Sequence, residues 1–415
     1  MQRKKLFRPA EILLPRNCDM SLWSTVACDQ FSSDRGYWDA VAAKTANVPS
    51  TMHLMLPEAY LQSVDQQAQG EKINSTMAEY LSTGVFALLE SSYVFVKRTL
   101  PDGTVRRGLV GALDLEGYDY SEGSQTPIRA TEHTVESRLP PRVAIRKQAL
   151  LEMPHIMVFI DDPSDSVMTC AEQSAGAELY DFELMCGGGH IRGAQISGGN
   201  AGTVTQLLDH LADDAVLQEK YGRCEGAIVY AMGDGNHSLA AAKKCWEEIR
   251  ETLSPADREN HPARFALVEL VNIHDPGVTF HPIHRTVFHI DPEAFAAHAR
   301  TELFSPDGTA VKIVFGGKEE TAFVQAASIG QVIERVDRFC QEYAKAHDGE
   351  VDYIHGDAEA VSYGTQPDAA SILLPGMEKG ELFTSVMNTG VFCKKSFSIG
   401  EAAEKRYYLE CRKIK

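Results

Sequence analysis

The sequence lacks the features that mark membrane proteins, disulfide-rich secreted proteins and cysteine zinc sites. No apolar run reaches the roughly 18 residues that a membrane-spanning helix requires. The basic start MQRKKLFRPAEILLP has no long apolar segment of the kind found in secretory signals. The nine cysteines are odd in number and form no CxxC pair. We therefore expect reduced thiols in a cytoplasmic protein with no membrane partner.

An excess of basic charge is also missing. The chain has 40 Lys and Arg against 58 Asp and Glu, which gives a formal net charge of -18. Because an acidic surface repels a phosphate backbone, we expect no nucleic-acid partner. A small anion in a local positive pocket is still compatible with this charge. The 415 residues, 44% of them hydrophobic, are enough to bury a large core.

The chain has no internal repeat and no low-complexity linker, and expected helices and strands alternate along it. A hairpin is expected around Pro101-Asp102-Gly103, between two β-rich runs. Further strands are expected at 155–162, 226–232 and 264–273, and helices at 142–153, 203–222, 238–253 and 329–347. The expected apolar face of helix 203–222 consists of Leu207, Leu208, Leu211 and Val216. This alternation predicts a mixed α/β (α+β) fold.

A weak shift in composition near residue 220 is the candidate domain boundary. It would separate residues 1–220, with the hairpin and an Arg-Glu-His segment, from residues 221–415, with a glycine-rich loop. The alternative is one integrated unit. The oligomeric state does not follow from the sequence.

The sharpest local signal is GAIVYAMGDGNHSLAAAKK, where an apolar strand to Met232 is followed by a glycine turn and an Ala-rich helix. A strand, a glycine turn and a helix N-terminus together form an anion site. The predicted phosphate-binding residues of this loop are Gly233, Gly235, Asn236 and Ser238, and the predicted catalytic residues are Asp234 and His237. The alternative is a plain turn in which Asn236 or Ser238 caps the helix.

A second cluster lies in PIRATEHTVESRLPPR, residues 127–142. Arg129 suits phosphate or carboxylate recognition. Glu132 beside His133 suits a catalytic base and the group that orients it. The alternative, which the sequence supports equally, is a polar loop closed by ion pairs.

A third signal is the histidine-rich stretch from His261 to His298, which contains HPIHR. His284 and Arg285 are predicted to bind phosphate, or else to lie at a strand edge. We predict no metal ligands here, because the proline in HPIHR is incompatible with a ligand-bearing helix. Lys394, in the basic C-terminal segment, is a further candidate for phosphate binding, although a solvated tail is the usual explanation of such a segment.

The order of the motifs resembles that of the family of proteins of unknown function DUF1015. The resemblance rests on PIRATEHT, PHIMVFIDDP, GGHIRG, MGDGNHSLA, HPARFALVELVNIHD, HPIHR, DYIHGD, ILLPGM and KSFSIGEAAEKRYYLECRKI, and extends over nearly the whole chain. Other branches of that family carry DGHHR where this chain has DGNHS. That loop is similar to the phosphate-binding loop of the ParB/sulfiredoxin superfamily, whose members bind nucleotides and include free-serine kinases.

The resemblance implies a ParB/sulfiredoxin-like nucleotide-binding core within a larger, elaborated fold, with ATP or ADP and Mg²⁺ as the expected cofactors. Relatives encoded beside serine-biosynthesis genes point to phosphoserine chemistry. This chain departs from the pattern at Ser238, which replaces the loop arginine. If an arginine grips phosphate in the relatives, then Arg129, Arg285 or Lys394 must supply that charge here.

Three functions remain open at this point. The first is a phosphotransferase that moves a phosphoryl group from a nucleotide to a small hydroxylated metabolite such as serine. The second is a phosphatase of small phosphorylated metabolites such as phosphoserine, which would use water at the same anion site. The third is a non-enzymatic regulator that binds a nucleotide or a metabolite.

Overall fold

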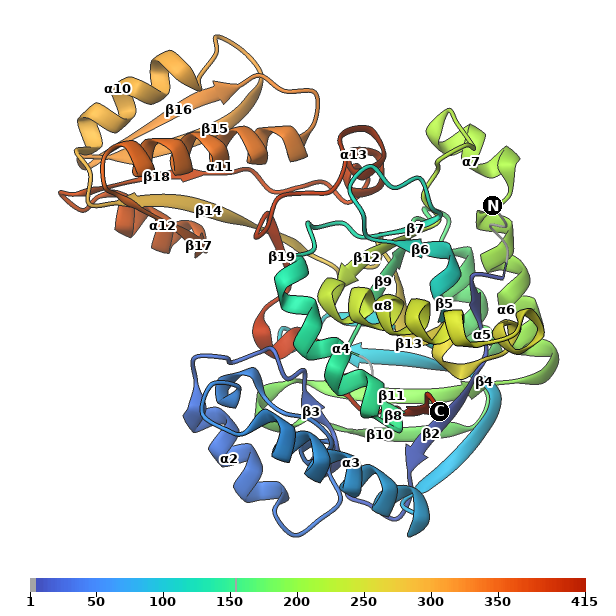
Figure 1. Cartoon of the computed structure of the whole chain (residues 1–415). Helices are drawn as coiled ribbons and strands as arrows, with labels where there is room; N and C mark the ends of the chain where they lie inside the picture. The colour runs from blue at the N-terminus through green and yellow to red at the C-terminus, as the bar shows by residue number, and fades with distance from the viewer. Residues whose placement is uncertain (1–4, 154) are drawn as a thin grey trace. The chain divides into compact units, whose positions relative to one another are not determined.

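The computed structural model of the chain describes residues 5–153 and 155–415 (Figure 1). The contacts divide the chain into two compact units. Unit 1 consists of Met1–Ala130, Thr134–Val278 and Glu401–Lys415, and unit 2 of Thr131–His133 and Thr279–Gly400. The composition shift near residue 220 falls inside unit 1, in the last turn of α7 (Asp214–Tyr221).

Unit 1 is built on a mixed sheet with the strand order β10-β11-β4-β5-β13-β9-β12-β7-β6, in which β1 also pairs with β5 and β2 with β4. β13 is parallel to β9, and β7 is parallel to β12 and β6. The strands are β1 Phe7–Arg8, β2 Ala10–Pro15, β4 Phe86–Thr99, β5 Val105–Asp114, β6 Tyr118–Asp119, β7 Ile128–Arg129, β9 Met157–Ile160, β10 Glu178–Glu183, β11 His190–Ile196, β12 Tyr230–Asp234 and β13 Phe265–Asn272.

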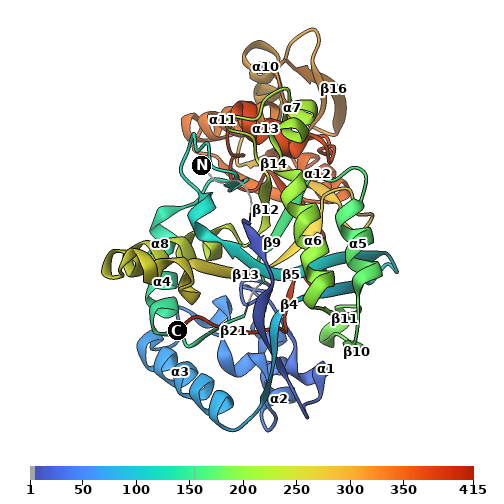
Figure 2. The ribbon, with the colours of Figure 1, turned by 90° about the vertical axis from the view of Figure 1, so that its right-hand side faces the viewer.

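Helices cover both faces of this sheet. Figure 2 shows α4 and α8 on one side of it and α5 and α6 on the other. The helices of unit 1 are α1 Met20–Trp23, α2 Arg35–Thr45, α3 Gln66–Ser82, α4 Leu139–Gln148, α5 Ser166–Ser174, α6 Gly198–Leu211, α7 Asp214–Tyr221, α8 Asn236–Thr252 and α9 Pro255–Glu259. Because both faces are covered, β9 and β13 are buried along their whole length, which explains their continuous apolar runs.

Most of the expected elements are confirmed. The hairpin is β4 and β5, which pair antiparallel around residues 100–104. The expected strand at 264–273 and the expected helices at 238–253 and 329–347 are present as β13, α8 and α11 (Ile329–Ala346). The mixed α/β class is confirmed by the sheet and by the helices on its two faces.

Two of the expected helices were wrong in extent. The helix expected at 203–222 is two helices, because α6 ends at Leu211 and Asp213 precedes a new helix as its N-cap. Of the expected apolar face only Leu208 is buried; Leu207, Leu211 and Val216 are half-buried, and Val204 and Leu217 are buried instead. The helix expected at 142–153 ends at Gln148.

Unit 2 is an antiparallel sheet with helices. The strand order is β16-β15-β18-β14-β17, and β19 also pairs with β14. Its strands are β14 Phe280–Phe288, β15 Thr309–Phe315, β16 Lys318–Val324, β17 Glu350–His355, β18 Ala369–Leu373 and β19 Phe397–Ile399. Its helices are α10 Pro292–Glu302, α11 Ile329–Ala346, α12 Asp357–Gly364 and α13 Glu381–Thr389. Val332, Val336 and Phe339 lie on the apolar face of α11 at helical spacing and are buried.

The C-terminal segment, residues 401–415, returns to unit 1 rather than forming a solvated tail. Its short strands β20 (Tyr407–Tyr408) and β21 (Arg412–Lys413) pair with β3 (Thr25–Val26) and β8 (Leu151–Glu152).

Buried ion pairs hold this segment in place. Arg406, 2% exposed, lies 3.0 Å from Glu269 through Nε and also donates to Glu410. Tyr180 donates to Glu410 at 2.6 Å, and Arg412 donates to Glu152 at 2.7 Å. The alternative of a solvated tail is therefore wrong for residues 401–415, because two of their guanidinium groups anchor the fold.

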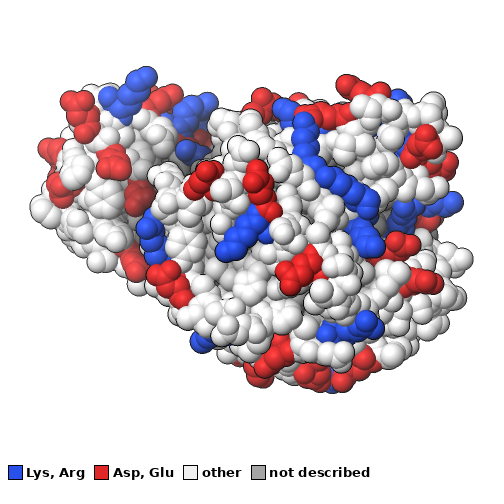
Figure 3. Space-filling model, turned by 60° about the horizontal axis from the view of Figure 1, so that its bottom comes forward, with Lys and Arg blue, Asp and Glu red and all other residues white. Residues whose placement is uncertain are grey.

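The surface carries charged side chains of both signs. On the face in Figure 3, acidic and basic side chains are interspersed among uncharged residues. Within residues 5–153 and 155–415, no helix combines the length and the apolar character that crossing a bilayer would require.

The first prediction concerns Arg406. Arg406→Met leaves Glu269 and Glu410 buried without their counter-charge, so we expect the free energy of unfolding of unit 1 to fall by about 3–5 kcal/mol. Urea unfolding followed by tryptophan fluorescence measures this, because Trp23, Trp38 and Trp246 are all buried in unit 1.

Arg192→Met is the matched control. Arg192 pairs with Glu178 and Asp181 at an exposed position of β11, so its loss should leave the urea midpoint nearly unchanged. Equal midpoints for the two variants would contradict the anchoring role of Arg406.

The second prediction concerns acid stability. Burial alone would raise the pKa of Glu152, but the charges of Arg412 and Arg146 outweigh burial and lower the pKa from its ordinary value. The stabilisation from ionised Glu152 is therefore complete above the unfolded-state pKa of about 4.3 and is lost as the pH falls through the lower folded-state value. Glu152→Gln should melt below the parent at pH 7, and the gap in Tm should shrink in acid. Exposed Glu90→Gln should show no such narrowing.

Candidate functional site

The GDGNHS segment connects a buried strand to a helix, as expected. β12 ends at Asp234, Gly235 is the N-cap, and α8 begins at Asn236. The turn is shorter than expected, because Gly233 and Asp234 belong to the strand. Within the described residues no side chain caps α8, so neither Asn236 nor Ser238 acts as the N-cap. The uncapped positive end of the helix dipole therefore favours an anion here.

The backbone conformation and the packing of this segment require glycine at both positions. Gly235 has φ +81°, a left-handed conformation that side chains with a Cβ rarely adopt. A Cβ on Gly233 would lie 2.8 Å from the ring of Phe159 on the neighbouring β9. Both glycines are thus needed to bring β12 against β9 and to turn at once into α8.

Lys405 brings a positive charge to this turn. Its Nζ lies 3.4 Å from Asp234 Oδ2, and the two side chains are 15% and 25% exposed. Lys405 belongs to the C-terminal segment, whose backbone is fixed by Arg98, which donates to the carbonyl oxygen of Lys405 at 2.6 Å. Lys405, which is not one of the three cations suggested by the sequence, therefore places a positive charge beside the loop.

His237 is held in a defined protonation state. Its Nε2 accepts the backbone N–H of Val135 at 3.2 Å. Only an unprotonated ring nitrogen can accept a hydrogen bond, so this geometry assigns the ring proton to Nδ1 and a neutral imidazole. A neutral ring also fits the helix N-terminus, where the dipole disfavours a second positive charge.

Two buried polar atoms in this region have no hydrogen-bond partner among the described residues. They are Asn236 Oδ1, in a residue 9% exposed, and Thr134 Oγ1, in a residue 5% exposed. Thr134 precedes Val135, whose N–H binds His237. Since buried polar groups are normally paired, a ligand with hydroxyl or amino groups would fit this position.

Arg129 holds its own segment together. It is 4% exposed, its Nε donates to Thr126 O at 2.7 Å, and its guanidinium also donates to Gly226 O. Burial, with the nearby charge of Arg223, lowers the pKa of Arg129 to about 10. Its predicted role in phosphate binding stays a prediction.

Glu132 and His133 belong to unit 2. Glu132 forms a β-bridge with Phe392, and the His133 N–H donates to Phe392 O at 3.0 Å. His133 is exposed and Glu132 is half-buried. Their predicted catalytic roles stay predictions.

His284 and Arg285 lie inside the sheet of unit 2. β14 pairs with β17 on one side and β18 on the other, so the alternative of a strand edge is wrong. His284 accepts the Leu374 N–H at 3.1 Å and contacts Asp357 at 3.0 Å. Burial lowers its pKa.

Arg285 is fully buried and donates to Asp337 at 2.7 Å. Lys394 is exposed, with its Nζ 5.7 Å from the centroid of the Tyr353 ring. The phosphate-binding roles of His284, Arg285 and Lys394 stay predictions.

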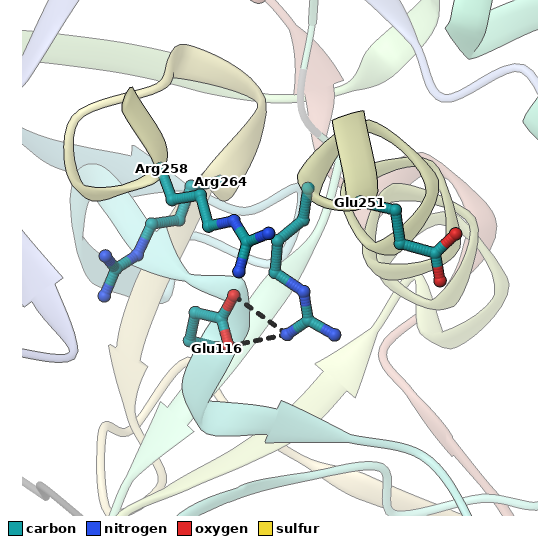
Figure 4. Close-up of a pocket in the computed structure, with 5 residues that line it drawn as sticks. Glu116, Glu251, Arg258 and Arg264 are labelled. Atoms are coloured by element: carbon teal, nitrogen blue, oxygen red, sulfur yellow. Dashed lines mark hydrogen bonds and ion pairs between the residues drawn. The ribbon is translucent and has the colours of Figure 1, made fainter. Parts of the chain in front are cut away.

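A cavity of about 580 Å³ lies elsewhere in unit 1 (Figure 4). It is lined by Glu116, Arg250, Glu251, Arg258 and Arg264. Arg250 is neutralised by Glu116, and Arg264 by Asp114. Arg250 is near the end of α8, so the helical rise places it roughly 20 Å from the loop. We take the uncapped end of α8, rather than this cavity, as the candidate site.

Sequence reasoning missed residues that contact the loop from far along the chain. Lys405 contacts Asp234, and His155 contacts Ser238. Tyr408 in turn contacts His155. The basic composition of the C-terminal segment was the sequence signal that could have identified Lys405 as a site residue. His155 and Tyr408 lie in apolar runs that look like ordinary core strands.

Comparison with protein families agrees with the order of the motifs. The model of the family described as "Protein of unknown function (DUF1015)" matches residues 8–362. The chain belongs to this family. A comparison with curated proteins finds no match.

Several solved structures align with much of the chain at low identity. SbnI with a C-terminal truncation, from Staphylococcus aureus, is 10% identical over 70% of this chain and 82% of that chain, with a TM-score of 0.36. A free serine kinase in complex with AMP is 11% identical over 72% and 93%, with a TM-score of 0.38. A conserved hypothetical protein from Pyrococcus furiosus is 11% identical over 72% and 90%, with a TM-score of 0.33. At such TM-scores the backbones overlap only in part.

The third prediction tests the turn. Gly235→Ala forces a side chain into a left-handed conformation and brings its Cβ 3.0 Å from Ile156. We expect it to lower the free energy of unfolding by about 1–2 kcal/mol. Gly202→Ala is the control, because Gly202 lies within α6 with no atom near its Cβ position. That change should instead stabilise the protein by up to about 1 kcal/mol. Changes of the same sign would contradict the geometry described for Gly235.

Proposed function

We propose that this protein is a phosphotransferase that moves a phosphoryl group from ATP to a small hydroxylated metabolite, with serine as the first acceptor to test. The observation that carries the proposal is the uncapped N-terminus of α8 beside the Lys405–Asp234 pair. Backbone N–H groups and a lysine are the donors that phosphate groups require. Phosphoryl transfer depends mainly on such positioning and charge neutralisation.

Each group near the loop has a defined task in this proposal. The first turn of α8 and Lys405 bind phosphate oxygens. The unpaired oxygens of Asn236 and Thr134 accept hydrogen bonds from the hydroxyl or amino groups of the nucleotide or the acceptor. His237, which the Val135 N–H holds as a neutral ring, supports the catalytic step as donor or base.

Asp234 suits Mg²⁺, which is usually held by one or two carboxylates together with substrate phosphates. When bound, the ion neutralises charge on the transferred phosphoryl group. Within the described residues no three His, Cys, Asp or Glu side chains converge as a metal site, so the substrate phosphates would complete the coordination.

Two alternatives use the same geometry. A phosphatase of small phosphorylated metabolites would use the anion site with water as the nucleophile. A non-enzymatic regulator would bind the nucleotide and leave it unchanged. The neutral His237 beside the anion site favours an enzyme, because it provides a group able to move a proton.

The fourth prediction is a pattern of ligand-induced shifts in Tm. We expect ATP and ADP to raise Tm, more strongly with Mg²⁺, and serine to raise it further in the presence of ADP. Turnover of ATP with serine, followed by ³¹P NMR, should yield a phosphorylated acceptor. Stabilisation by phosphoserine alone would favour the phosphatase, and stabilisation by nucleotide without turnover would favour the regulator.

Three variants test whether nucleotide binding and turnover occur at the N-terminus of α8. Lys405→Gln should weaken nucleotide binding at least several-fold, because a phosphate contact of a charged donor is typically worth about 1.5–3 kcal/mol. Lys244→Gln, an exposed position on α8, is the matched control and should bind as the parent does. His237→Ala should retain most of the nucleotide-induced shift but lose turnover. Unchanged binding in Lys405→Gln would place the nucleotide elsewhere.

A further inference from the structure

A chain of hydrogen bonds runs inward from Ser238. Ser238 Oγ lies 3.3 Å from His155 Nε2, and His155 Nδ1 lies 3.2 Å from the Tyr408 hydroxyl. The same hydroxyl is 3.1 Å from Cys28 Sγ and accepts the Cys28 N–H at 3.3 Å. His155 is 9% exposed and Tyr408 4% exposed, and their rings meet edge to face. The four residues come from segments far apart in the sequence.

One consistent set of hydrogen-bond directions assigns a tautomer to His155. The Tyr408 hydroxyl has one proton, which it donates to Cys28 Sγ, and its oxygen also accepts the Cys28 N–H. Burial raises the pKa of the Cys28 thiol to about 12, so the sulfur stays uncharged. With that proton directed to Cys28, the contact of the hydroxyl oxygen with His155 Nδ1 takes its donor from the ring N–H. Nε2 is then unprotonated and can accept the proton of Ser238.

We propose that Ser238 is the nucleophile of this protein, that His155 is its general base, and that Tyr408 is the residue that positions His155. The arrangement has the three parts that an activated hydroxyl requires: a nucleophile, a base within hydrogen-bond reach, and a group that orients the base. A Ser–His distance of 3.3 Å suits a site without substrate, where such contacts are often loose.

The position of Ser238 supports this role. It lies in the first turn of α8, where phosphate would bind, and its side chain is half-buried whereas His155 and Tyr408 are buried. The hydroxyl is therefore the accessible end of the relay, and the base is shielded from water.

This inference rests on the proposed function and specifies the route of the phosphoryl group from ATP to the acceptor. Ser238 Oγ attacks the terminal phosphorus of ATP, the bond to the bridging oxygen breaks, and ADP leaves with the bonding electron pair. The proton of Ser238 passes to His155 Nε2. The acceptor hydroxyl then attacks the phosphoserine, its own proton passing to solvent. Ser238 leaves from phosphorus with the bonding electrons and regains a proton from His155.

An alkyl fluorophosphonate tests the nucleophile without reference to the natural substrate. Ser238 attacks its phosphorus, fluoride leaves, and the proton passes to His155. Peptide mapping by mass spectrometry should place the label on Ser238, with no label on exposed Ser82 of α3. His155→Gln should lower the labelling rate by roughly 100-fold or more. A folded parent that is not labelled at Ser238, or a His155→Gln variant labelled at the parental rate, would overturn the proposal.

The positioning role of Tyr408 has its own measurement. In protein labelled with ¹⁵N-histidine, His155 should show a protonated Nδ1 and an unprotonated Nε2 in NMR spectra. Tyr408→Phe removes the hydroxyl and should redistribute the two tautomers and slow fluorophosphonate labelling, with melting checked to show that the fold is retained. If the tautomer is unchanged in Tyr408→Phe, Tyr408 has no positioning role.

A trapping experiment separates this inference from the proposed function. After brief incubation with ATP and Mg²⁺, phosphopeptide mapping should find phosphate on Ser238 of the parent, and Ser238→Ala should lose transfer to the acceptor while Ser82→Ala keeps it. Phosphoryl transfer without phosphoserine, and with Ser238→Ala fully active, would overturn the intermediate and leave the proposed function standing. Fluorophosphonate labelling of Ser238 with no response to any nucleotide would keep the nucleophile and reject the phosphotransferase.

Discussion

The ion pairs that Arg406 forms with Glu269 and Glu410 are the interaction on which the candidate site depends. They are buried, and they hold the end of the chain against the large sheet of unit 1. Two residues of that returning segment reach the site, Lys405 at Asp234 and Tyr408 at His155. Burying these charges is costly unless each is paired, so the C-terminal segment has essentially one well-paired arrangement in unit 1.

The site itself results from the very short connection between β12 and α8. A single left-handed glycine, Gly235, is the one residue between the end of β12 and the start of α8, and no side chain among the described residues caps the helix N-terminus. Close packing of Gly233 on Phe159 holds the end of the strand in place. The same geometry that satisfies the fold thus presents helix N–H groups, a carboxylate and a half-buried hydroxyl together, which explains why one short segment combines structural and chemical roles.

Hydrogen-bond partners then distinguish His237 from His155. His237 accepts a backbone N–H at Nε2, whereas in the proposed relay His155 donates its Nδ1 proton to the oxygen of Tyr408. Val135 therefore holds Nε2 of His237, whereas Tyr408 holds Nδ1 of His155. The electrostatic character of the site follows from these partners and from Lys405, rather than from the strongly acidic charge of the whole chain.

The sequence by itself determined the local elements: the hairpin, the strand–glycine–helix connection and the long amphipathic helix of unit 2. Their signals, turn residues and apolar periodicity, act over a few residues. It could not determine the break after Leu211, where a new N-cap competes with a continuous apolar pattern. Only the tertiary structure decided that the basic C-terminal segment is buried and that Lys405, His155 and Tyr408 reach the loop, because ion pairs and hydrogen bonds between distant segments leave no periodic trace in the chain.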